Sequence, residues 1–458
     1  MYSGVMNGEF CYQVLHKNLT NNNISSSSRI VRTQKRLGEI PIMVLSKACH
    51  LADKTCHQLV SLKEEDNEMG GYFIVNGIER IVRLLQVQRR NHPIGLIRSS
   101  FQKRGPVYSE YGVSMRCANY CGDQTTITNT LHYLTTGGVT LRFSMRKQEF
   151  LVPIILLFRA CCSASEDDGN NDINRTKVAS VTDEEIYNKI VQGDIKNTFL
   201  RARAELLLQD ARRFGFYTPE EALTYLGARF RNLTGKPLSV SDTDVGHYVI
   251  RKFIMIHLPI YQDKQESLLL MLRKLYALVG GTCLPDNADS LQNHELLLPG
   301  HFITSFVKEK LEETLRAVYL GISKDIRMDF TRAMSDLQTT KYWMKCLDRY
   351  GQLNGAGVGK KVNYLLSTGN VKSTTGLDLM QASGFTIVAD KINFLRYLSH
   401  FRSVHRGQFF TTMKSTAVRK LLPDQWGFLC PVNTPDGSPC GLLSHITRNC
   451  SVLSYPED

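Results

Sequence analysis

The sequence predicts a multidomain protein of the α+β class, in which a mainly β first third precedes helices and then short mixed elements. Its 458 residues correspond to about three domains of ordinary size. Strand-like alternation dominates before residue 150 and amphipathic helical periodicity after it. Hydrophobic residues make up 42% and charged residues 22% of the chain. This composition excludes disordered, collagen-like and coiled-coil classes.

Turn residues delimit the predicted strands. Asn76-Gly77 predicts a tight hairpin turn, and Gly137-Gly138 marks another turn. The strand-like stretches around these turns are Pro41–Ser46, Tyr72–Val75, Ile78–Val87, Tyr111–Arg116 and Val139–Phe143. Together they make the first third of the chain mainly β.

Helical periodicity begins at Thr182 or Asp183, either of which can cap a helix. The predicted helices are Asp183–Val191, Asn197–Phe214, Pro219–Leu226, Asp242–His257, Glu266–Val279, Phe302–Leu320 and Asp325–Tyr350. One apolar stripe on the fifth of them consists of Leu268, Met271, Leu272, Leu275 and Leu278. Gly351–Gly359 breaks the pattern, and short mixed elements are expected from Val362 onward.

A strong positive charge suggests a polyanionic partner. The 56 Lys and Arg exceed the 43 Asp and Glu, which gives a formal charge of +13. Two windows, Arg80–Ser109 and Lys391–Lys420, each hold seven Lys or Arg and no acidic residue. The second window also contains Phe394, Tyr397, Phe401, Phe409 and Phe410. Aromatic side chains could stack on bases or pack in a core, whereas the charge clusters favour a surface that faces phosphates.

Membrane insertion and secretion are not expected. The first fifteen residues lack the apolar region of a signal peptide. The longest apolar run, Phe150–Phe158, is half the length of about 18 residues that a bilayer-spanning helix requires. The twelve scattered cysteines indicate reduced thiols in a cytosolic or nuclear protein. Cys49-His50 and Cys56-His57 are the pairs nearest to a metal pattern, but their spacing fits no standard ligand set, which favours a buried core.

No catalytic motif is visible, although one glycine-rich stretch resembles a phosphate-binding loop. In Asn354–Lys361 the first glycine of a P-loop is replaced by Asn354, and Lys361 stands where Ser or Thr is required. A flexible loop is therefore favoured over a nucleotide site. There is no nucleophile elbow, His-Glu-x-x-His or clustered aspartate motif for magnesium. Asp424 and Asp436 are single carboxylates typical of turns.

Several long stretches, in order, resemble the second-largest subunit of multisubunit DNA-directed RNA polymerases, and more narrowly that of eukaryotic RNA polymerase I. The stretches that carry the resemblance are Gly70–Arg80, Gln88–Pro93, Arg273–Leu278, Leu365–Asn370, Lys391–Arg406 and Val418–Leu442. The similarity runs from about Tyr2 to Cys450. Several ordered matches over nearly the whole chain are much more specific than one short motif.

The resemblance implies a protrusion over residues 1–120, a lobe over 121–290, a second part of the protrusion over 291–362 and a fork region over 363–458. It implies a nuclear, nucleolar subunit that helps to form the DNA cleft for transcription of ribosomal RNA genes. Expected partners are DNA, the RNA–DNA hybrid, the largest subunit and accessory subunits that dock on the lobe. The acidic loop Glu166–Asp172 could contribute to that docking, although a solvated loop is the favoured interpretation.

The resemblance also implies where the chemistry lies. The catalytic Mg²⁺ of the family is held by aspartates of the largest subunit, so this chain is expected to bind no metal and to be noncatalytic by itself. Within Arg402–Lys414, which corresponds to the fork loops, Arg402, His405, Arg406 and Lys414 would contact or steer the separated strands. Arg419 and Lys372 are further candidates. Asn433 stands where relatives carry Glu or His, which argues against an acidic or proton-linked role at that position.

Two other hypotheses remain open at this point. The first is an independent nucleic-acid-binding module derived from a polymerase subunit, and the second is an NTPase that uses the Gly355–Lys360 loop. The family's hybrid-binding, wall and clamp segments would follow residue 458, so the chain is expected to be an amino-terminal portion of a longer subunit.

Overall fold

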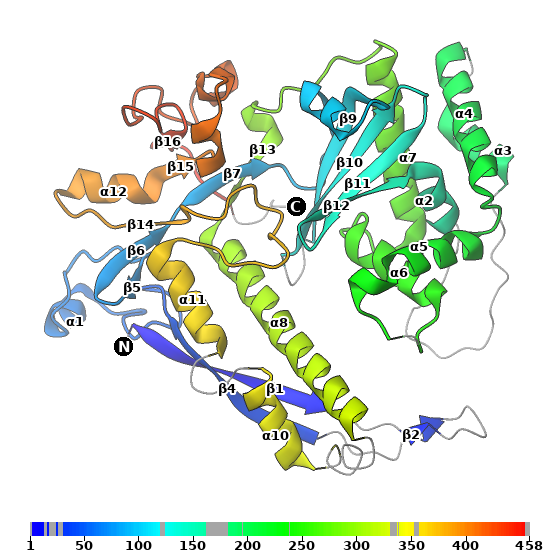
Figure 1. Cartoon of the computed structure of the whole chain (residues 1–458). Coiled ribbons are helices and arrows are strands. Elements are labelled where there is room, and N and C mark those ends of the chain that lie inside the picture. The colour runs from blue at the N-terminus through cyan, green and yellow to red at the C-terminus, as the bar shows by residue number, and fades with distance from the viewer. Residues whose placement is uncertain are drawn as a thin grey trace.

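The computed structural model describes residues 2–12, 16–17, 24–25, 31–119, 124–161, 182–194, 196–237, 239–329, 337, 339–351 and 357–453. In Figure 1 one half of the molecule contains a five-stranded sheet with helices α2–α7, and the other half contains the smaller sheets with α1, α11 and α12. The mixture of sheets and helices confirms the predicted multidomain α+β class.

The five-stranded sheet is antiparallel throughout, in the order β12-β11-β10-β9-β8. Its strands are β8 (Ile94–Ile97), β9 (Tyr108–Ala118), β10 (Thr126–Leu134), β11 (Val139–Met145) and β12 (Gln148–Pro153). The predicted boundary between protrusion and lobe, at residue 120, falls between the neighbouring strands β9 and β10. The division into domains stays a prediction.

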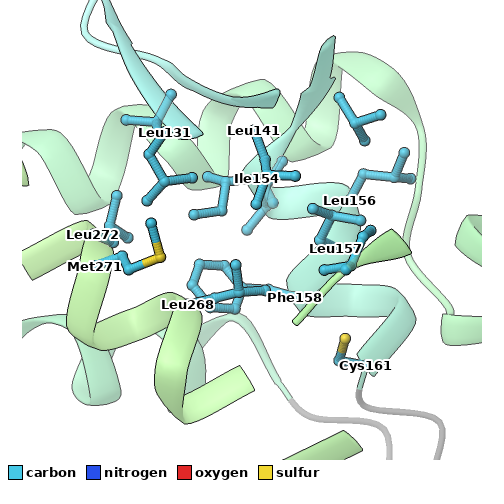
Figure 2. Close-up of a cluster of buried hydrophobic side chains, with 14 of the residues drawn as sticks. Leu131, Leu141, Ile154, Leu156, Leu157, Phe158, Cys161, Leu268, Met271 and Leu272 are labelled. Carbon is cyan, nitrogen blue, oxygen red and sulfur yellow. The ribbon is translucent and has the colours of Figure 1, made fainter. Parts of the chain in front are cut away.

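Helices that follow this sheet in sequence pack against it. They are α2 (Ile154–Cys161), α3 (Asp183–Val191), α4 (Thr198–Phe214), α5 (Pro219–Thr234), α6 (Asp242–Phe253) and α7 (Tyr261–Val279). Figure 2 shows Leu131 and Leu141 from the sheet meeting Phe158 of α2 and Leu268 and Met271 of α7. These side chains are at most 2% exposed, so the apolar run after Pro153 forms a buried helix at the centre of the largest core.

The capping signals place the helix ends where the sequence predicts them. Thr182 and Glu185 form a capping box at the start of α3, and Asn197 accepts a hydrogen bond from the Leu200 amide at the start of α4. Gly215 ends α4 in the left-handed conformation. The predicted apolar stripe on α7 is confirmed, since all five of its side chains are buried. The predicted ends of α5 and α6 are wrong by several residues, since α5 continues past Leu226 to the left-handed Gly235 and α6 ends at Phe253 instead of His257. Helix ends are the least reliable part of a prediction from periodicity.

The other half of the molecule is built from four smaller sheets. A four-stranded sheet has the order β13-β7-β15-β16, a three-stranded sheet has the order β14-β6-β5, and β1 pairs with β4 and β2 with β3. The strands are β1 (Ser3–Tyr12), β2 (His16–Lys17), β3 (Ile24–Ser25), β4 (Val31–Pro41), β5 (Phe73–Val75), β6 (Ile78–Val82), β7 (Leu84–Gln88), β13 (His294–Leu297), β14 (Thr386–Val388), β15 (Ser403–His405) and β16 (Leu443–His445).

One long helix and several short ones support these sheets. The α-helices are α1 (Cys56–Ser61), α8 (Pro299–Met328), α10 (Thr340–Arg349), α11 (Gly357–Thr368) and α12 (Phe394–Arg402). Short 3₁₀ helices are η1 (Ser99–Arg104), η2 (Leu291–Asn293), η3 (Gln408–Thr412), η4 (Ala417–Arg419) and η5 (Pro423–Gln425). Helices α8 and α11 lie side by side (Figure 1). Phe302 and Phe306 of α8 share a core with Val362 and Leu365 of α11. None of the helices formed by the described residues is long and apolar enough to cross a bilayer.

Four local predictions are wrong. Pro41 ends strand β4, and turns follow it, so Pro41–Ser46 is not a strand. Ile78–Val87 is divided at Arg83 into β6 and β7, which enter different sheets. The predicted break over Gly351–Gly359 is too long, because helix α11 begins at Gly357. The predicted helix Asp325–Tyr350 is interrupted, because α8 ends at Met328, α10 begins at Thr340, and Asp329 and Thr339 lie outside any helix. At α11, burial of Val358 and Val362 in the core that they share with α8 overrides the low helix propensity of the glycines.

Candidate nucleic-acid interface

The structure brings the two acid-free windows of the sequence into one sheet. Strand β7 comes from the first window and β15 from the second. The two strands pair in parallel, with Val404 opposite Leu84 and His405 opposite Leu85. On its other side β15 pairs with β16, with Val404 opposite Ser444. The centre of the predicted fork region is therefore a buried strand, in which Val404 is 1% exposed.

Arg402 lies at the end of α12, and its guanidinium already holds backbone groups. Its Nε and Nη2 donate to the Ile446 carbonyl at 3.1 and 2.9 Å, and Nη2 also donates to the Thr447 carbonyl. The Arg402 carbonyl accepts a hydrogen bond from the Ile446 amide. Arg402 thus ties the end of α12 to the segment after β16, and this geometry orients its charge into the protein.

His405 is a core residue of β15. Its side chain is 3% exposed, and its Nδ1 accepts a hydrogen bond from the Gly407 amide at 2.7 Å. Burial and the charge of Arg83 lower the pKa of His405 to about 4. The ring is therefore neutral at physiological pH, where it shapes the turn that follows β15.

Arg406 follows β15 and is also internal. Its Nη2 lies 2.6 Å from Oδ1 of Asp289, and the guanidinium carbon lies 5.2 Å from the centre of the Phe410 ring. The Arg406 side chain is 8% exposed and that of Asp289 is 29% exposed. The guanidinium is thus neutralised by a carboxylate that lies more than a hundred positions earlier in the chain.

Arg419 organises the loop between β15 and β16. Its Nη1 donates to the carbonyls of Ser438 and Cys440 at 2.6 and 2.8 Å. The Arg419 carbonyl also lies close to Gly441, where a Cβ would come within 2.5 Å of it. Gly441 has a φ of +73°, which together with this close approach explains why glycine stands there.

Lys414 is the predicted site residue whose charge points to solvent. It lies in the exposed segment between η3 and η4, with Lys420 six residues later. Among the described residues neither lysine side chain takes part in an ion pair or hydrogen bond. The neighbouring Phe409 is 47% exposed and Met413 36% exposed. This segment therefore combines free positive charge with exposed apolar side chains, the composition that suits contact with single-stranded nucleic acid.

Lys372 is exposed on a loop that a buried carboxylate holds in place. Its Nζ lies 4.3 Å from the centre of the Tyr364 ring. In the next three residues, the backbone amides of Thr374 and Thr375 and three side-chain hydroxyls donate to Oε1 of Glu309, at 2.8 to 3.1 Å. Although burial opposes it, these hydrogen bonds and the Lys310 charge lower the pKa of Glu309. Glu309 on α8 thus fixes the loop that presents Lys372.

Other cationic side chains of the two windows form ion pairs with carboxylates that lie far away in the sequence. Arg90 pairs with Glu295 at 2.9 Å and Lys391 with Glu79 at 2.9 Å. Arg116, which follows the first window, also binds Glu295, at 2.5 Å. The absence of acidic residues within a window therefore does not leave all of its charges free in the folded chain.

Sequence reasoning missed a cavity of about 420 Å³ between β7, β13 and the segment after β16. Its lining includes the exposed Arg89 as well as His294, His301 and Phe428. Burial and the Arg406 charge lower the pKa of His294 to about 4. These residues lie far apart in sequence, so no local motif could have indicated the cavity.

Asn433 and Asp424 lie in the same region. Asn433 is exposed, and its carbonyl oxygen accepts a hydrogen bond at 3.0 Å from Nδ1 of His445. Oδ2 of Asp424 accepts hydrogen bonds from the Ser290 hydroxyl and the Leu291 amide, both at 2.6 Å. Burial opposes the shift, but these hydrogen bonds lower the pKa of Asp424. Asp424 thus anchors the predicted fork region to the segment that leads into β13.

The Cys–His pairs do not converge on one point. Cys49 is 5% exposed within a hydrophobic cluster with Leu51 and Leu59, whereas Cys56 is exposed at the start of α1. The ring of His50 packs against Tyr2, with their centres 5.1 Å apart. In the part of the chain that the structure describes, no group of three or more His, Cys, Asp or Glu side chains is arranged to hold a metal ion.

Family comparisons agree with the resemblance seen in the sequence. A family model described as "RNA polymerase beta subunit" matches residues 9–341. A second model, described as "RNA polymerase Rpb2, domain 3", matches residues 387–452, which include β15, β16 and the exposed Lys414 segment. The first match covers most of the chain. The chain belongs to the RNA polymerase beta subunit family.

More specifically, the chain is similar to subunits of RNA polymerase I. It is 46% identical over 424 residues to the "Probable DNA-directed RNA polymerase I subunit RPA2" of Schizosaccharomyces pombe, an alignment that covers 93% of this chain and 34% of the relative. It is 45% identical to "DNA-directed RNA polymerase I subunit RPA135" of Saccharomyces cerevisiae, which covers 92% of this chain and 33% of the relative. Identity to "DNA-directed RNA polymerase I subunit RPA2" of Homo sapiens is 40%, over 91% of this chain and 34% of the relative.

These comparisons confirm the predicted resemblance to the second-largest subunit of RNA polymerase I. The chain spans about a third of the length of the curated relatives that it matches.

Proposed function

We propose that the chain acts as the protrusion, lobe and fork portion of an RNA polymerase I second-largest subunit and contributes to transcription of ribosomal RNA genes. The observation that carries this proposal is identity of 40% to 46% to RNA polymerase I subunits over more than nine-tenths of the chain. The portion is noncatalytic by itself, and its cellular place is the nucleus and nucleolus.

Within this role, the exposed segment around Lys414 contacts nucleic acid. Lys414 and Lys420 supply charge for phosphates, and Phe409 offers an exposed aromatic face for a base. Lys372 adds charge from the loop that Glu309 holds. Arg402, His405, Arg406 and Arg419 act indirectly, because their bonds to carbonyls, an amide and a carboxylate fix the conformation of this surface.

The other components of the reaction come from elsewhere in the complex. We propose that the Mg²⁺ used in nucleotidyl transfer is held by the largest subunit, and that this chain positions DNA and the RNA–DNA hybrid beside it. Other polymerase subunits dock on the part built from the five-stranded sheet and helices α2–α7. The acidic loop Glu166–Asp172, considered above for such docking, lies outside the described residues.

A chimeric polymerase tests this function. The matching third of the Saccharomyces cerevisiae RPA135 subunit is replaced by this chain, and assembly and ribosomal RNA synthesis are measured in a strain that depends on the chimera. We expect assembly and synthesis to be retained. A chimera that fails to assemble, or that assembles but does not transcribe, would contradict the proposal. A subunit rebuilt in the same way with the unaltered yeast segment controls for the exchange itself.

The NTPase alternative has little support in the geometry. Gly357–Lys361 forms the first turn of helix α11 and not an open loop, and the Lys361 ammonium lies 3.5 Å from Glu313. Gly355 lies outside the described residues. We expect no phosphate release from ATP by the purified chain, and release that disappears in Lys360→Ala would revive this hypothesis. The module hypothesis is tested by whether the encoding transcript continues past Asp458 into further polymerase sequence.

A further inference from the structure

A second cavity, of about 210 Å³, lies where the two halves of the molecule meet. It is bounded by β10 and β11, by the end of α5, by α6 and α8, and by residues 375–378. Its walls include the apolar side chains Met145, Leu233 and Phe253 and the hydroxyls of Thr126, Ser144 and Ser305. None of these residues belongs to the candidate nucleic-acid interface.

Four cationic side chains from three separate elements line this cavity. Arg146 comes from the turn between β11 and β12, Lys252 from α6, and Lys308 and Arg316 from α8. Three carboxylates also line it, those of Glu309, Glu312 and Asp378. Whether an anion can bind therefore depends on which of the cations these carboxylates already neutralise.

Each of these carboxylates already forms ion pairs or accepts hydrogen bonds from groups other than the two arginines. Glu312 lies 3.3 Å from Lys252 and 3.9 Å from Lys308. Glu309 accepts the hydrogen bonds of the 373–375 loop described above. Oδ2 of Asp378 accepts a hydrogen bond from the Thr128 hydroxyl at 2.7 Å. Burial raises the pKa of Asp378, which weakens it further as a source of negative charge.

The two arginines are left without a carboxylate among the described residues. Arg316 lies against Gly235, where a Cβ would come 3.1 Å from its Nη2. Burial and then the charge of Arg316 lower the pKa of Arg146, so the two guanidinium groups repel each other in the absence of an anion. Arg146 holds its position with a φ of +51°, in a turn where Lys147 also has a positive φ.

We propose that this cavity binds a compact oxyanion of the phosphate class between Arg146 and Arg316. Each guanidinium group presents parallel N–H donors that match the oxygens of phosphate, and both arginines line the same cavity. The cavity is smaller than the roughly 300 to 1,000 Å³ of sites for drug-sized ligands. A free phosphate ion or one phosphate group fits such a space better than a nucleotide does.

Binding at this position would join the two halves of the molecule. Arg146 lies in the turn that joins β11 and β12 of the five-stranded sheet, whereas Arg316 belongs to α8, which packs with α11 in the other core. A ligand that bridges the two arginines stabilises the folded arrangement by mass action. Phosphate is therefore expected to raise the thermal unfolding temperature of the chain.

The test titrates inorganic phosphate into the 458-residue chain by calorimetry, against sodium chloride at matched ionic strength. Saturable binding of phosphate and a rise in unfolding temperature are expected, with no comparable effect of chloride. Arg146→Gln and Arg316→Gln should each weaken binding on the order of tenfold to a hundredfold, because each removes charge-assisted hydrogen bonds. Arg316→Lys keeps the charge but loses the parallel donors, and is expected to bind with intermediate affinity.

Arg229→Gln is the matched control, since Arg229 is an exposed arginine of α5 whose Nη1 contacts the Tyr225 hydroxyl. It should bind phosphate as the parent chain does. Equal effects of phosphate and chloride would overturn the proposal, as would unchanged binding by both glutamine variants. Circular dichroism of the unliganded variants verifies that they are folded. If Arg146→Gln does not fold, Arg316→Gln and Arg316→Lys decide the question, because position 316 is exposed.

Discussion

At the scale of single residues, the decisive feature is which carboxylate or carbonyl group each positively charged side chain contacts. Arg406 and Asp289 form a nearly buried pair at 2.6 Å, and Arg402 and Arg419 each donate to carbonyls of the chain. A guanidinium has five donors, so folding brings it to carbonyls and carboxylates that a local window of sequence does not contain. By contrast, Lys414 remains exposed. Sequence composition therefore located the basic region but could not distinguish anchoring arginines from free lysines.

The Arg406–Asp289 pair gives the first prediction. Arg406→Gln should destabilise the chain by about 2 kcal/mol, because it leaves the Asp289 carboxylate without its partner. Urea unfolding measures this change, and Lys414→Gln serves as the comparison, with a change of at most about 0.5 kcal/mol expected for an exposed side chain. An Arg406→Gln chain as stable as its parent would show that the pair has no anchoring role.

Buried histidines give a prediction about pH. Burial is the main cause that lowers the pKa of His132 to about 3 and the pKa values of His257, His294 and His405 to about 4. The unfolded chain takes up these protons near pH 6.5, whereas the folded chain does not. The contribution of these buried, neutral histidines to the free energy of unfolding is therefore fully present above about pH 6.5. It is lost as the pH falls toward 4.

His132 is the residue chosen for this test, since its side chain is fully buried. Its ring lies edge-on to that of Phe101, with the two ring centres 4.7 Å apart. His132→Phe removes one of the titrating groups. The variant should lose less thermal stability than its parent between about pH 7.5 and pH 5. If thermal unfolding curves of the two chains show the same pH dependence, buried His132 does not contribute to the acid sensitivity.

At the scale of elements, several packing contacts require glycine. A Cβ at Gly227 of α5 would lie 1.7 Å from the Asp242 carbonyl oxygen, and one at Gly246 of α6 would lie 2.3 Å from the Leu223 carbonyl oxygen. The two helices therefore cross with their backbones in contact. The sequence indicated both helices through their helical periodicity, but it could not indicate that each glycine serves the crossing of one helix on the other.

Gly359 shows the same principle in the segment that resembled a phosphate-binding loop. A Cβ at this position of α11 would lie 2.4 Å from the carbonyl oxygen of Glu39 on β4. Gly359→Ala should therefore destabilise the chain by about 1 to 3 kcal/mol, even though alanine favours a helix. Lys360→Ala, at the next and exposed position, is the matched control and should not be destabilising. Chemical unfolding distinguishes these outcomes, and a neutral Gly359→Ala would argue against the close contact of α11 with β4.

At the scale of the whole molecule, segments far apart in sequence pair as strands of the same sheet. Strand β13 pairs with β7, and β15 pairs with both β7 and β16, so one sheet contains residues from 84 to 445. The α+β class and the helices after residue 182 could be predicted, because caps and periodicity are local. The β1–β4 pair could not, since its strands are rich in glycine and polar residues, and β1 alternates between exposed and half-buried positions without a buried face. The family resemblance supplied the expected position of the fork region, which local chemistry alone did not.

The salt dependence of nucleic-acid binding tests the whole surface. If the Lys414 segment contacts phosphates, the parent chain should bind single-stranded DNA of mixed sequence with an affinity that falls linearly with salt on logarithmic axes. Lys414→Gln and Lys420→Gln should each reduce the slope by about 0.7, since each removes one phosphate contact to a single strand. Lys54→Gln, at an exposed lysine beside α1, is the control and should leave the slope as in the parent chain. Fluorescence anisotropy at several salt concentrations measures the slopes. A slope near zero would exclude this segment as the nucleic-acid contact, and so would equal slopes for the parent and both variants. The arginines would then retain only their anchoring contacts.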